Sequence, residues 1–233
     1  MTPPETQNSI QTTSKHPYII VGGPQASGKS TLIRHLRSTF RNTQFLQETR
    51  QIVVRRYDLL GAIFMSEVDE LEIIYSDLLR LTTVIRSQHP DIHVDETSVF
   101  TLGHARAHGI DLLEGYFSHY CKLLSRLTAG VIFLDARPAI SWERRKARYE
   151  DRLLGSPDHL RTALLAKYRE YLFKLHPELC SVYEMIAFPK RRVNSETDQS
   201  KFLADGVTAF ADLLSEVGVT PEPRVDTEEA DST

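Results

Sequence analysis

Residues 23 to 30 read Gly-Pro-Gln-Ala-Ser-Gly-Lys-Ser, which is a complete G-x-x-x-x-G-K-S phosphate-binding loop. The apolar run Tyr18–Val21 leads into it as a predicted buried strand, and Thr31–Leu36 leads out of it as a predicted amphipathic helix. This strand–loop–helix order is the context in which the motif binds phosphate. The alternative is a glycine-rich turn followed by a chance Lys-Ser pair, and the match at every fixed position in this context disfavours it. We therefore expect the chain to bind a nucleoside triphosphate.

Each part of the loop has a predicted task in holding phosphate. Gly23 and Gly28 allow the backbone to curl so that successive N–H groups point toward phosphate oxygens, and the helix that opens at Lys29 adds the positive end of its dipole. The Lys29 ammonium can reach the outer phosphates, and the Ser30 hydroxyl can ligate Mg²⁺. The loop residues predicted to bind nucleotide are Gly23, Pro24, Gln25, Ala26, Ser27, Gly28, Lys29, Ser30 and Thr31.

The composition is that of an ordinary α/β protein. The chain has 233 residues, 41% hydrophobic and 25% charged, with a formal net charge of −3, so neither nucleic acid nor a membrane surface is an expected partner. No apolar run approaches the roughly 20 residues that span a bilayer, and residues 1–15 lack the apolar core of a secretory signal. Cys121 and Cys180 have no metal-type partner nearby in the sequence. Reduced thiols are therefore expected, which suits a cytoplasmic protein.

Two polar segments flank the predicted domain. Residues 1–15 carry almost no apolar side chains, and residues 219–233 hold five acidic groups, one arginine and two prolines. We expect a disordered N-terminal lead, a single domain over residues 16–218, and an acidic disordered tail over residues 219–233. A docking peptide is the alternative interpretation of the tail.

Short apolar segments alternate with helical stretches between these tails, which is the pattern of a parallel sheet wrapped by helices. The predicted strands are Tyr18–Val21, Thr43–Leu46, Asp91–Val94, Val131–Leu134 and Glu184–Phe188. The predicted helices cover residues 29–40, 49–59, 67–88, 98–127, 138–153, 157–173 and 197–216. Right-handed crossovers place the loop after each strand along one edge of the sheet. The chemistry is expected at Gly23–Ser30, Gln47–Arg50, Asp95–Thr97 and the segment after Leu134.

Carboxylates follow two of the predicted strands. A carboxylate beside a phosphate loop is where Mg²⁺ or its water shell is usually held. Asp95 is therefore predicted on the metal side, and Glu96 is a candidate for base or substrate contact. A plain turn pair is the alternative. Glu48 follows the second strand and can accept a proton from an attacking hydroxyl. Its alternative role is that of a first-turn acid that interacts with the dipole of its own helix.

The densest cationic stretch is Ser141–Arg152. Arg144, Arg148 and Arg152 recur at every fourth position and share one helix face, which Arg145 borders. Guanidinium groups grip phosphate oxygens and stabilise the charge of a transferring phosphoryl group, whereas the alternative is a solvated face. Because the stretch follows the fourth strand, we predict a lid over about residues 143–157. A lid that excludes water is more typical of a kinase than of a hydrolase.

In this order, these features resemble the thymidylate kinase and deoxynucleoside kinase group of P-loop phosphotransferases. The matching pieces are the phosphate loop Gly23–Ser30, the acid Glu48, the run Asp95–Thr97, the strand 131–135 with its arginine helix, and the helix 159–172. The likeness spans roughly residues 17 to 216, and the phosphate loop is its one specific motif. It implies a P-loop NTPase fold of the α/β class: a five-stranded parallel sheet between helices, with a helical lid that carries arginines.

The resemblance also implies roles for single residues. Glu48 corresponds to the base that activates the acceptor hydroxyl, and Arg144, Arg145 and Arg148 correspond to lid residues that contact the triphosphate. Members of the group usually carry acid-Arg-Ser where this chain has Asp95-Glu96-Thr97, so the arginine that holds the substrate is replaced. Arg50 or Arg106 is the candidate substitute, beside Glu96, on the substrate side.

Three functions fit the sequence. The first is a kinase that uses ATP and Mg²⁺ to phosphorylate a small nucleoside-like or nucleotide-like acceptor, with Lys29, Glu48, Arg144 and Arg148 as catalytic residues, Ser30 and Asp95 on the metal, and a homodimer as the candidate assembly. The second is an NTP-hydrolysing switch or ATPase that uses Asp95-Glu96. The third is a nucleotide-binding regulatory protein. His104 and His108 have a metal-type spacing without an evident third ligand, so solvent-facing or substrate-lining positions are expected.

Overall fold

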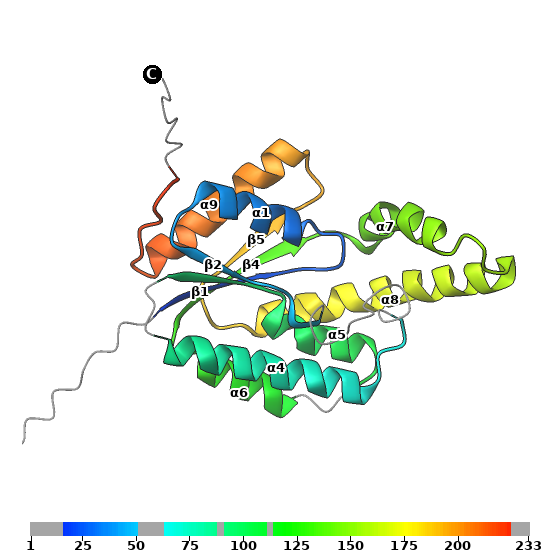
Figure 1. Ribbon diagram of the computed structural model, residues 1–233, viewed down its shortest axis with the longest axis horizontal. Helices are drawn as coiled ribbons and strands as arrows, with labels where there is room; N and C mark the ends of the chain where they lie inside the picture. Colours follow the sequence, from blue (N-terminus) through cyan, green and yellow to red (C-terminus); the bar gives the residue numbers. More distant parts are fainter. Residues whose placement is uncertain (1–15, 51–62, 88–90, 111–113, 225–233) are drawn as a thin grey trace, which may run out of the picture.

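Five parallel strands form one sheet in the order β2-β3-β1-β4-β5 (Figure 1). The computed structural model describes residues 16–50, 63–87, 91–110 and 114–224. The strands are β1 (Pro17–Gly22), β2 (Thr43–Leu46), β3 (Ile92–Glu96), β4 (Thr128–Asp135) and β5 (Lys190–Asn194). β1 lies at the centre and pairs with β3 on one side and β4 on the other, in the parallel sense. The predicted fold class, a P-loop NTPase fold with a five-stranded parallel sheet, is confirmed.

Helices cover both faces of the sheet (Figure 1). α1 (Lys29–Thr39) and α9 (Gln199–Glu216) lie on one face, whereas α4 (Glu67–Arg86), α5 (Thr101–Ala107), α6 (Glu114–Leu124) and α8 (Asp158–Met185) lie on the other. A 3₁₀ turn, η1 (Ser98–Phe100), precedes α5. The helix α7 (Pro138–Arg152) projects beyond the sheet together with the first half of α8. This three-layer arrangement is the one that alternating strands and helices predict.

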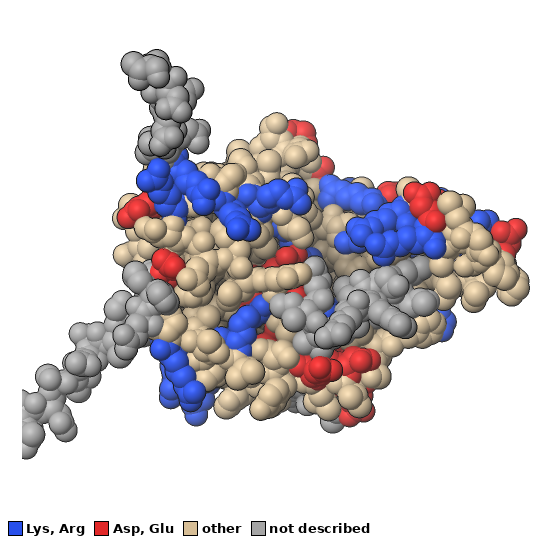
Figure 2. All heavy atoms as spheres, in the orientation of Figure 1, with Lys and Arg blue, Asp and Glu red and all other residues tan. Residues whose placement is uncertain are grey.

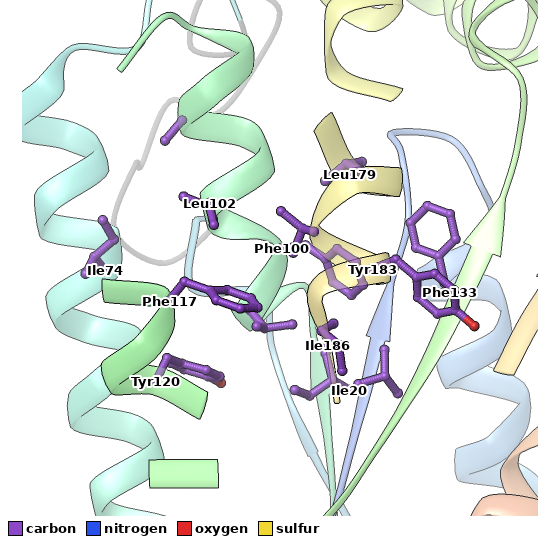
Figure 3. Packing of buried hydrophobic residues seen from close by; sticks show 14 of the residues in the cluster. Ile20, Ile74, Phe100, Leu102, Phe117, Tyr120, Phe133, Leu179, Tyr183 and Ile186 are labelled. Carbon is purple, nitrogen blue, oxygen red and sulfur yellow. The ribbon is translucent and has the colours of Figure 1, made fainter. Parts of the chain in front are cut away.

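Alternation along the central strand divides the core between the two faces. Ile19 and Val21 of β1 pack toward α1 and α9, whereas Tyr18 and Ile20 pack toward the helices of the opposite face. Figure 3 shows the larger cluster, in which Ile20 lies close to the aromatic rings of β4, η1 and α8. β1 is buried along its whole length, which explains why its sequence is a continuous apolar run.

Three predicted elements differ from the structure, and one of them is the helix 157–173, which extends to Met185 as α8. The predicted helix 98–127 is interrupted at Gly109, whose φ of 76° lies in the left-handed region and ends α5. The predicted strand 184–188 is wrong, because α8 continues through Pro177 to Met185 and the strand follows at Lys190. β5 was missed because it is a basic edge strand, in which Lys190 and Arg192 lie over the ring of Tyr183 at 4.7 Å and 5.0 Å from its centroid.

The first residues of the predicted tail do not belong to a solvated segment. Arg41 N donates to Glu222 O at 2.8 Å, and Arg224 N donates to Thr39 O at 2.8 Å, so residues 219–224 lie against the connection between α1 and β2. The predicted lead 1–15, the remainder of the tail and residues 51–59 of the predicted helix 49–59 lie outside the described residues. Among the described helices, none combines the length and the apolar character needed to cross a membrane.

Candidate active site

The phosphate loop follows β1 and ends where α1 begins. Gly23 has a φ of 142° and Gly28 a φ of 93°, values that side-chain-bearing residues rarely adopt. A Cβ on Gly23 would lie 2.4 Å from Leu134 O, so the loop also needs glycine there for its close approach to β4. Lys29 is buried, and its Nζ donates to Gly23 O and Pro24 O, both at 3.1 Å. The lysine is therefore held inside the ring of the loop.

A cavity of about 590 Å³ opens beside this loop. Its walls come from the phosphate loop, the ends of β2 and β3, α5 and α7, and they are mostly polar and charged. The lining residues are Gln25, Ala26, Gly28, Lys29, Ser30, Thr31, Glu48, Glu96, His104, Arg144, Arg145, Arg148, Tyr149 and Arg152. The structure thus brings six of the nine predicted loop residues, both predicted glutamates and the predicted lid arginines around one space, whereas Gly23, Pro24 and Ser27 are not among the lining residues. Its volume is in the range of small-molecule sites.

Glu96 lies on the phosphate-loop side of this cavity. Ser30 Oγ donates a hydrogen bond of 3.2 Å to Glu96 Oε1, which brings the loop hydroxyl and a strand-end carboxylate together. Burial raises the pKa of Glu96, and the neighbouring Glu48 raises it further, whereas Lys29 lowers it. Two carboxylates and one hydroxyl close to an ammonium are a set of hard oxygen donors in a partly compensated field.

Asp95 is not part of the cavity, and its predicted place on the metal side is wrong. Its carboxylate is fully buried and accepts hydrogen bonds from Arg80 Nη2 at 2.7 Å, from the Tyr18 hydroxyl and from the Ser98 hydroxyl. Side chains alternate along a strand, so Asp95 points to the face of α4 and Glu96 points back to the face of α1, where Ser30 begins the helix. The acid pair was identified correctly, but Glu96 and not Asp95 faces the phosphate loop.

Two arginines predicted on the substrate side lie elsewhere. Arg50 forms a buried bidentate pair with Glu70 of α4, with Nη1–Oε1 at 2.6 Å and Nη2–Oε2 at 2.7 Å. This pair joins the segment after β2 to α4, and Arg50 is absent from the cavity lining given above. Arg106 is also outside the lining, and its Nη1 lies 3.9 Å from Met185 Sδ at the end of α8. Among the described residues, neither Arg50 nor Arg106 therefore takes the place of the substrate arginine, which members of the group carry and this chain lacks.

Glu48 lies where the sequence predicted it. It follows β2, lines the cavity and is buried, with Lys29, Ser30 and Glu96 in the same wall. The proximity of its charge contributes to raising the pKa of both Glu96 and Asp95. The carboxylate that the family resemblance assigns as the base thus lines the cavity beside the phosphate loop.

The arginine helix forms one side of the cavity. Figure 2 shows Lys and Arg side chains gathered over α7. Arg144 reaches back to the phosphate loop, where Nη1 donates to Ala26 O at 3.0 Å, and its Nη2 donates to Ser195 O at 2.6 Å. Arg145, Arg148 and Arg152 line the same cavity. The charged face predicted for this helix thus points to the site.

Aromatic packing connects this helix to the loop. The Tyr168 hydroxyl of α8 donates to Gln25 Oε1 at 2.5 Å, and Tyr149 of α7 packs edge-on against the Tyr168 ring with centroids 4.6 Å apart. The loop, α7 and α8 therefore meet at one tyrosine.

Sequence reasoning missed Arg80. It lies in α4 and joins three elements, since its guanidinium donates to Asp95 of β3, to Asp77 of its own helix at 3.3 Å and to the backbone oxygen of Gln47. An arginine within the apolar run of Leu78, Leu79 and Leu81 was the available signal.

The expectation for His104 is corrected in part. It is not solvent-facing: only 2% of the residue is exposed, and it lines the cavity. Its Nδ1 lies 2.7 Å from the Tyr171 hydroxyl, and the His108 ring stacks on the same tyrosine with centroids 4.6 Å apart. Burial, with Arg50 and Lys29 nearby, holds the pKa of His104 well below its ordinary value, so its imidazole is neutral.

Cys180 has metal-type neighbours in space, contrary to the expectation from sequence. His176 Nε2 lies 3.0 Å from Asp135 Oδ1, and Cys180 belongs to the same cluster. The Cys180 sulfur lies 4.0 Å from Nδ1 and 3.9 Å from Nε2 of His176. Arg192 Nη1, 3.6 Å from Asp135 Oδ2, adds a positive charge. The ligand-type atoms of Asp135, His176 and Cys180 lie within 4.8 Å of one another, and Asp135 is also paired with Arg192.

No protein-family model matches this chain, and no curated protein sequence matches it. Among solved structures, it is similar to deoxyadenosine kinase from M. mycoides with bound dATP, at 15% identity and a TM-score of 0.53, over 85% of this chain and 99% of that one. The structure of the same enzyme with the products dCMP and a flexible dCDP gives 16% identity and a TM-score of 0.51, with the same coverage. The similarity shows a shared fold over most of both chains.

Proposed function

We propose that this protein is a kinase that transfers the γ-phosphate of ATP to a small nucleoside-like or nucleotide-like acceptor. The observation that carries the proposal is the single cavity in which Lys29, Glu48 and the arginines of α7 face one another. Lysine and arginine bind a polyphosphate, a buried carboxylate accepts a proton, and both are needed at the same place for phosphoryl transfer.

Binding of the triphosphate rests on the loop and α7. The backbone of residues 23–28 and the N-terminus of α1 supply amide donors, and Lys29 exchanges its two loop carbonyls for phosphate oxygens. Arg144 likewise exchanges Ala26 O for a phosphate oxygen, since the carbonyl it contacts belongs to the loop itself. The Lys29 ammonium and the Arg144 guanidinium then neutralise the charge that spreads over the transferring phosphoryl group.

Magnesium fits the oxygen donors at the end of β3. The Ser30 hydroxyl and the Glu96 carboxylate are 3.2 Å apart, and both are ligand types that Mg²⁺ prefers, directly or through its water shell. A bound Mg²⁺ would supply charge neutralisation for the phosphates. It would also relieve the repulsion between Glu48 and Glu96 that contributes to the raised pKa of Glu96.

Glu48 is the proposed general base. When the acceptor is a hydroxyl, its proton passes to the Glu48 carboxylate while the acceptor oxygen bonds to the γ-phosphorus. The bond from that phosphorus to the β–γ bridging oxygen breaks, and ADP leaves with the bond electrons. When the acceptor is a phosphate already ionised, no proton needs to move and Glu48 has an orienting role.

Hydrolysis is the less favoured alternative because of Asp95. A switch or ATPase that uses Asp95 and Glu96 as a metal-and-water pair needs both carboxylates at the cavity. Asp95 is instead buried and held by Arg80, Tyr18 and Ser98. The arginines of α7 also line a site that a ligand can fill to the exclusion of water, which favours transfer to an organic acceptor.

The comparisons support a nucleoside as the acceptor class. The structurally similar protein from M. mycoides is a deoxyadenosine kinase, and it was solved with dATP and with the product dCMP. The shared fold extends over 85% of this chain, so an acceptor of that chemistry is the first to test.

The proposal is tested by incubating the purified protein with ATP, Mg²⁺ and a panel of nucleosides and nucleoside monophosphates. Mass spectrometry then detects any compound that gains the mass of one phosphoryl group. We expect at least one nucleoside or nucleotide product in the wild type and none in Lys29→Ala. ATP binding without a product for any acceptor of the panel would contradict a nucleoside or nucleotide kinase.

A further inference from the structure

His104 carries a buried polar atom without a partner, at the wall of the cavity. Its Nδ1 is bonded to the Tyr171 hydroxyl at 2.7 Å, whereas Nε2 has no hydrogen-bond partner among the described residues. Only 2% of the residue is exposed, and its ring lines the same cavity as Lys29 and Glu48. A buried nitrogen left unpaired in a protein is costly, so one that stands at a cavity is free to take its missing bond from a ligand or an ordered water.

The imidazole is neutral, and this limits which group it can bind. Burial and the nearby Arg50 and Lys29 lower the pKa of His104 well below its ordinary value, so it adds no positive charge for a phosphate. Lys29 and the arginines of α7 already supply that charge. Because Tyr171 can either donate to Nδ1 or accept from it, Nε2 is an acceptor in one tautomer and a donor in the other. A hydroxyl group pairs with either form.

A hydrogen bond from a second helix holds the imidazole ring of His104 in this position. Tyr171 belongs to α8 and His104 to α5, so the hydrogen bond between them ties the cavity-lining helix α5 to α8, whose residues are not among those that line the cavity. The imidazole is therefore held through Nδ1 while Nε2 stays available, and such support orients a binding residue.

We propose that His104 is a substrate-contacting residue, which recognises a hydroxyl group of the phosphoryl acceptor through Nε2. The inference rests on the proposed kinase function and assigns a specificity role within its site. Phosphates are bound by the cationic residues, and the neutral histidine distinguishes acceptors by a neutral polar group. A site that hydrogen-bonds a substrate hydroxyl rejects analogues that lack it, because its own buried group is then left unpaired.

The experiment compares the best nucleoside acceptor with analogues that each lack one sugar hydroxyl. We expect the wild type to disfavour one analogue by about tenfold to a hundredfold in kcat/KM. His104→Ala should raise the KM of the parent acceptor by a similar factor, leave the KM for ATP unchanged and lose most of that discrimination. His104→Gln, whose amide can occupy the place of Nε2, should retain part of it.

His108→Ala is the matched control. It removes the imidazole that follows directly after α5 and stacks on the same tyrosine, but His108 does not line the cavity. It should therefore keep the wild-type discrimination, and a circular dichroism melt checks the folding of each variant. Full discrimination in a folded His104→Ala protein, or an equal loss in His108→Ala, would overturn the inference alone. A wild type that phosphorylates no nucleoside would overturn the proposed function and this inference with it.

Discussion

The Ser30 hydroxyl donates to the Glu96 carboxylate across 3.2 Å, although 66 residues separate the two in the chain. This contact joins the end of the phosphate loop to the end of β3 and brings together the two oxygen donors proposed for Mg²⁺. It also shows which of two adjacent acids faces the cavity.

Glu96→Gln should weaken magnesium binding. The amide keeps the size of the side chain but removes the negative charge that attracts the cation, so the Mg²⁺ concentration for half-maximal rate should rise about tenfold or more. Titrating the kinase rate with Mg²⁺ at saturating ATP measures this. Glu196→Gln is the control, because Glu196 pairs with the exposed Arg137 outside the cavity lining. An unchanged Mg²⁺ requirement in Glu96→Gln would remove Glu96 from the metal side.

Glu48→Gln should slow phosphoryl transfer to a hydroxyl acceptor by about 10² to 10⁴ in kcat, because the proton of the hydroxyl loses its acceptor. The KM for ATP should change little, since phosphate binding rests on Lys29 and the loop. Steady-state kinetics with both substrates varied separates the two effects. If Glu48→Gln turns over at the wild-type rate, Glu48 is not the base.

Arg144→Ala should reduce kcat by about 10² to 10³, because a preorganised cation at the transferring group is lost. Arg137→Ala is matched to it in chemistry, but Arg137 is 73% exposed and pairs with Glu196. Its rate should stay close to that of the wild type. Equal rates for the two variants would contradict a role for Arg144 at the phosphates.

The buried acid Asp77 should make stability depend on pH. Burial, with Asp95 nearby, raises the pKa of Asp77 from 3.8 to about 7, so between these values the folded protein holds a proton that the unfolded chain has released. The contribution of this group is therefore greatest at the acid end of that range and is lost as the pH rises to about 7. Asp77→Asn cannot titrate.

Urea unfolding of both proteins at pH 5 and pH 8 measures this effect. From pH 5 to pH 8 the wild type should lose free energy of unfolding through Asp77, whereas Asp77→Asn should not. The free energy of unfolding of the variant minus that of the wild type should therefore be larger at pH 8 than at pH 5. A difference that stays constant, or that moves in the opposite direction, would contradict a protonated Asp77 in the folded state.

Gly22→Ala should destabilise the strand that leads into the loop. A Cβ at Gly22 would lie 1.9 Å from Cε2 of Phe100. The Phe100 side chain is fully buried, so its ring cannot move aside into solvent. Such overpacking reduces stability by about 1–3 kcal/mol or more. Gly115→Ala is the control, because a Cβ there meets nothing within 4 Å, and thermal unfolding should show it unchanged or slightly stabilised. A wild-type melting temperature for Gly22→Ala would contradict the packing described.

The parts of the site that sequence predicts correctly are the local ones. The phosphate loop is a contiguous motif, so its residues, its strand and its helix are all recognisable within twenty positions. Helical periodicity was sufficient to place Arg144, Arg148 and Arg152 on one face of α7, and that face lines the cavity. Glu48 was found because parallel strands end at a common edge.

The parts that sequence does not predict depend on contacts between distant segments. Whether Asp95 or Glu96 faces the loop is decided by which side of β3 packs on α4, and Arg80 fixes it by binding Asp95. Arg50 was assigned to substrate because its buried partner Glu70 lies twenty residues away. No local pattern signals either pairing. The edge strand β5 was not predicted for a related reason, because its basic residues Lys190 and Arg192 are stabilised by the ring of Tyr183 in α8.

The most direct measurement of the central claim is the rate of ADP formation from ATP and Mg²⁺ with and without a nucleoside acceptor. If the cavity transfers phosphate to an organic hydroxyl or phosphate, ADP should form slowly alone and many times faster with the right acceptor, in equal amount to the phosphorylated product. Lys29→Ala should show neither rate. ADP formation that is rapid without an acceptor and unaffected by every nucleoside and nucleotide tested would contradict the account and indicate a hydrolase.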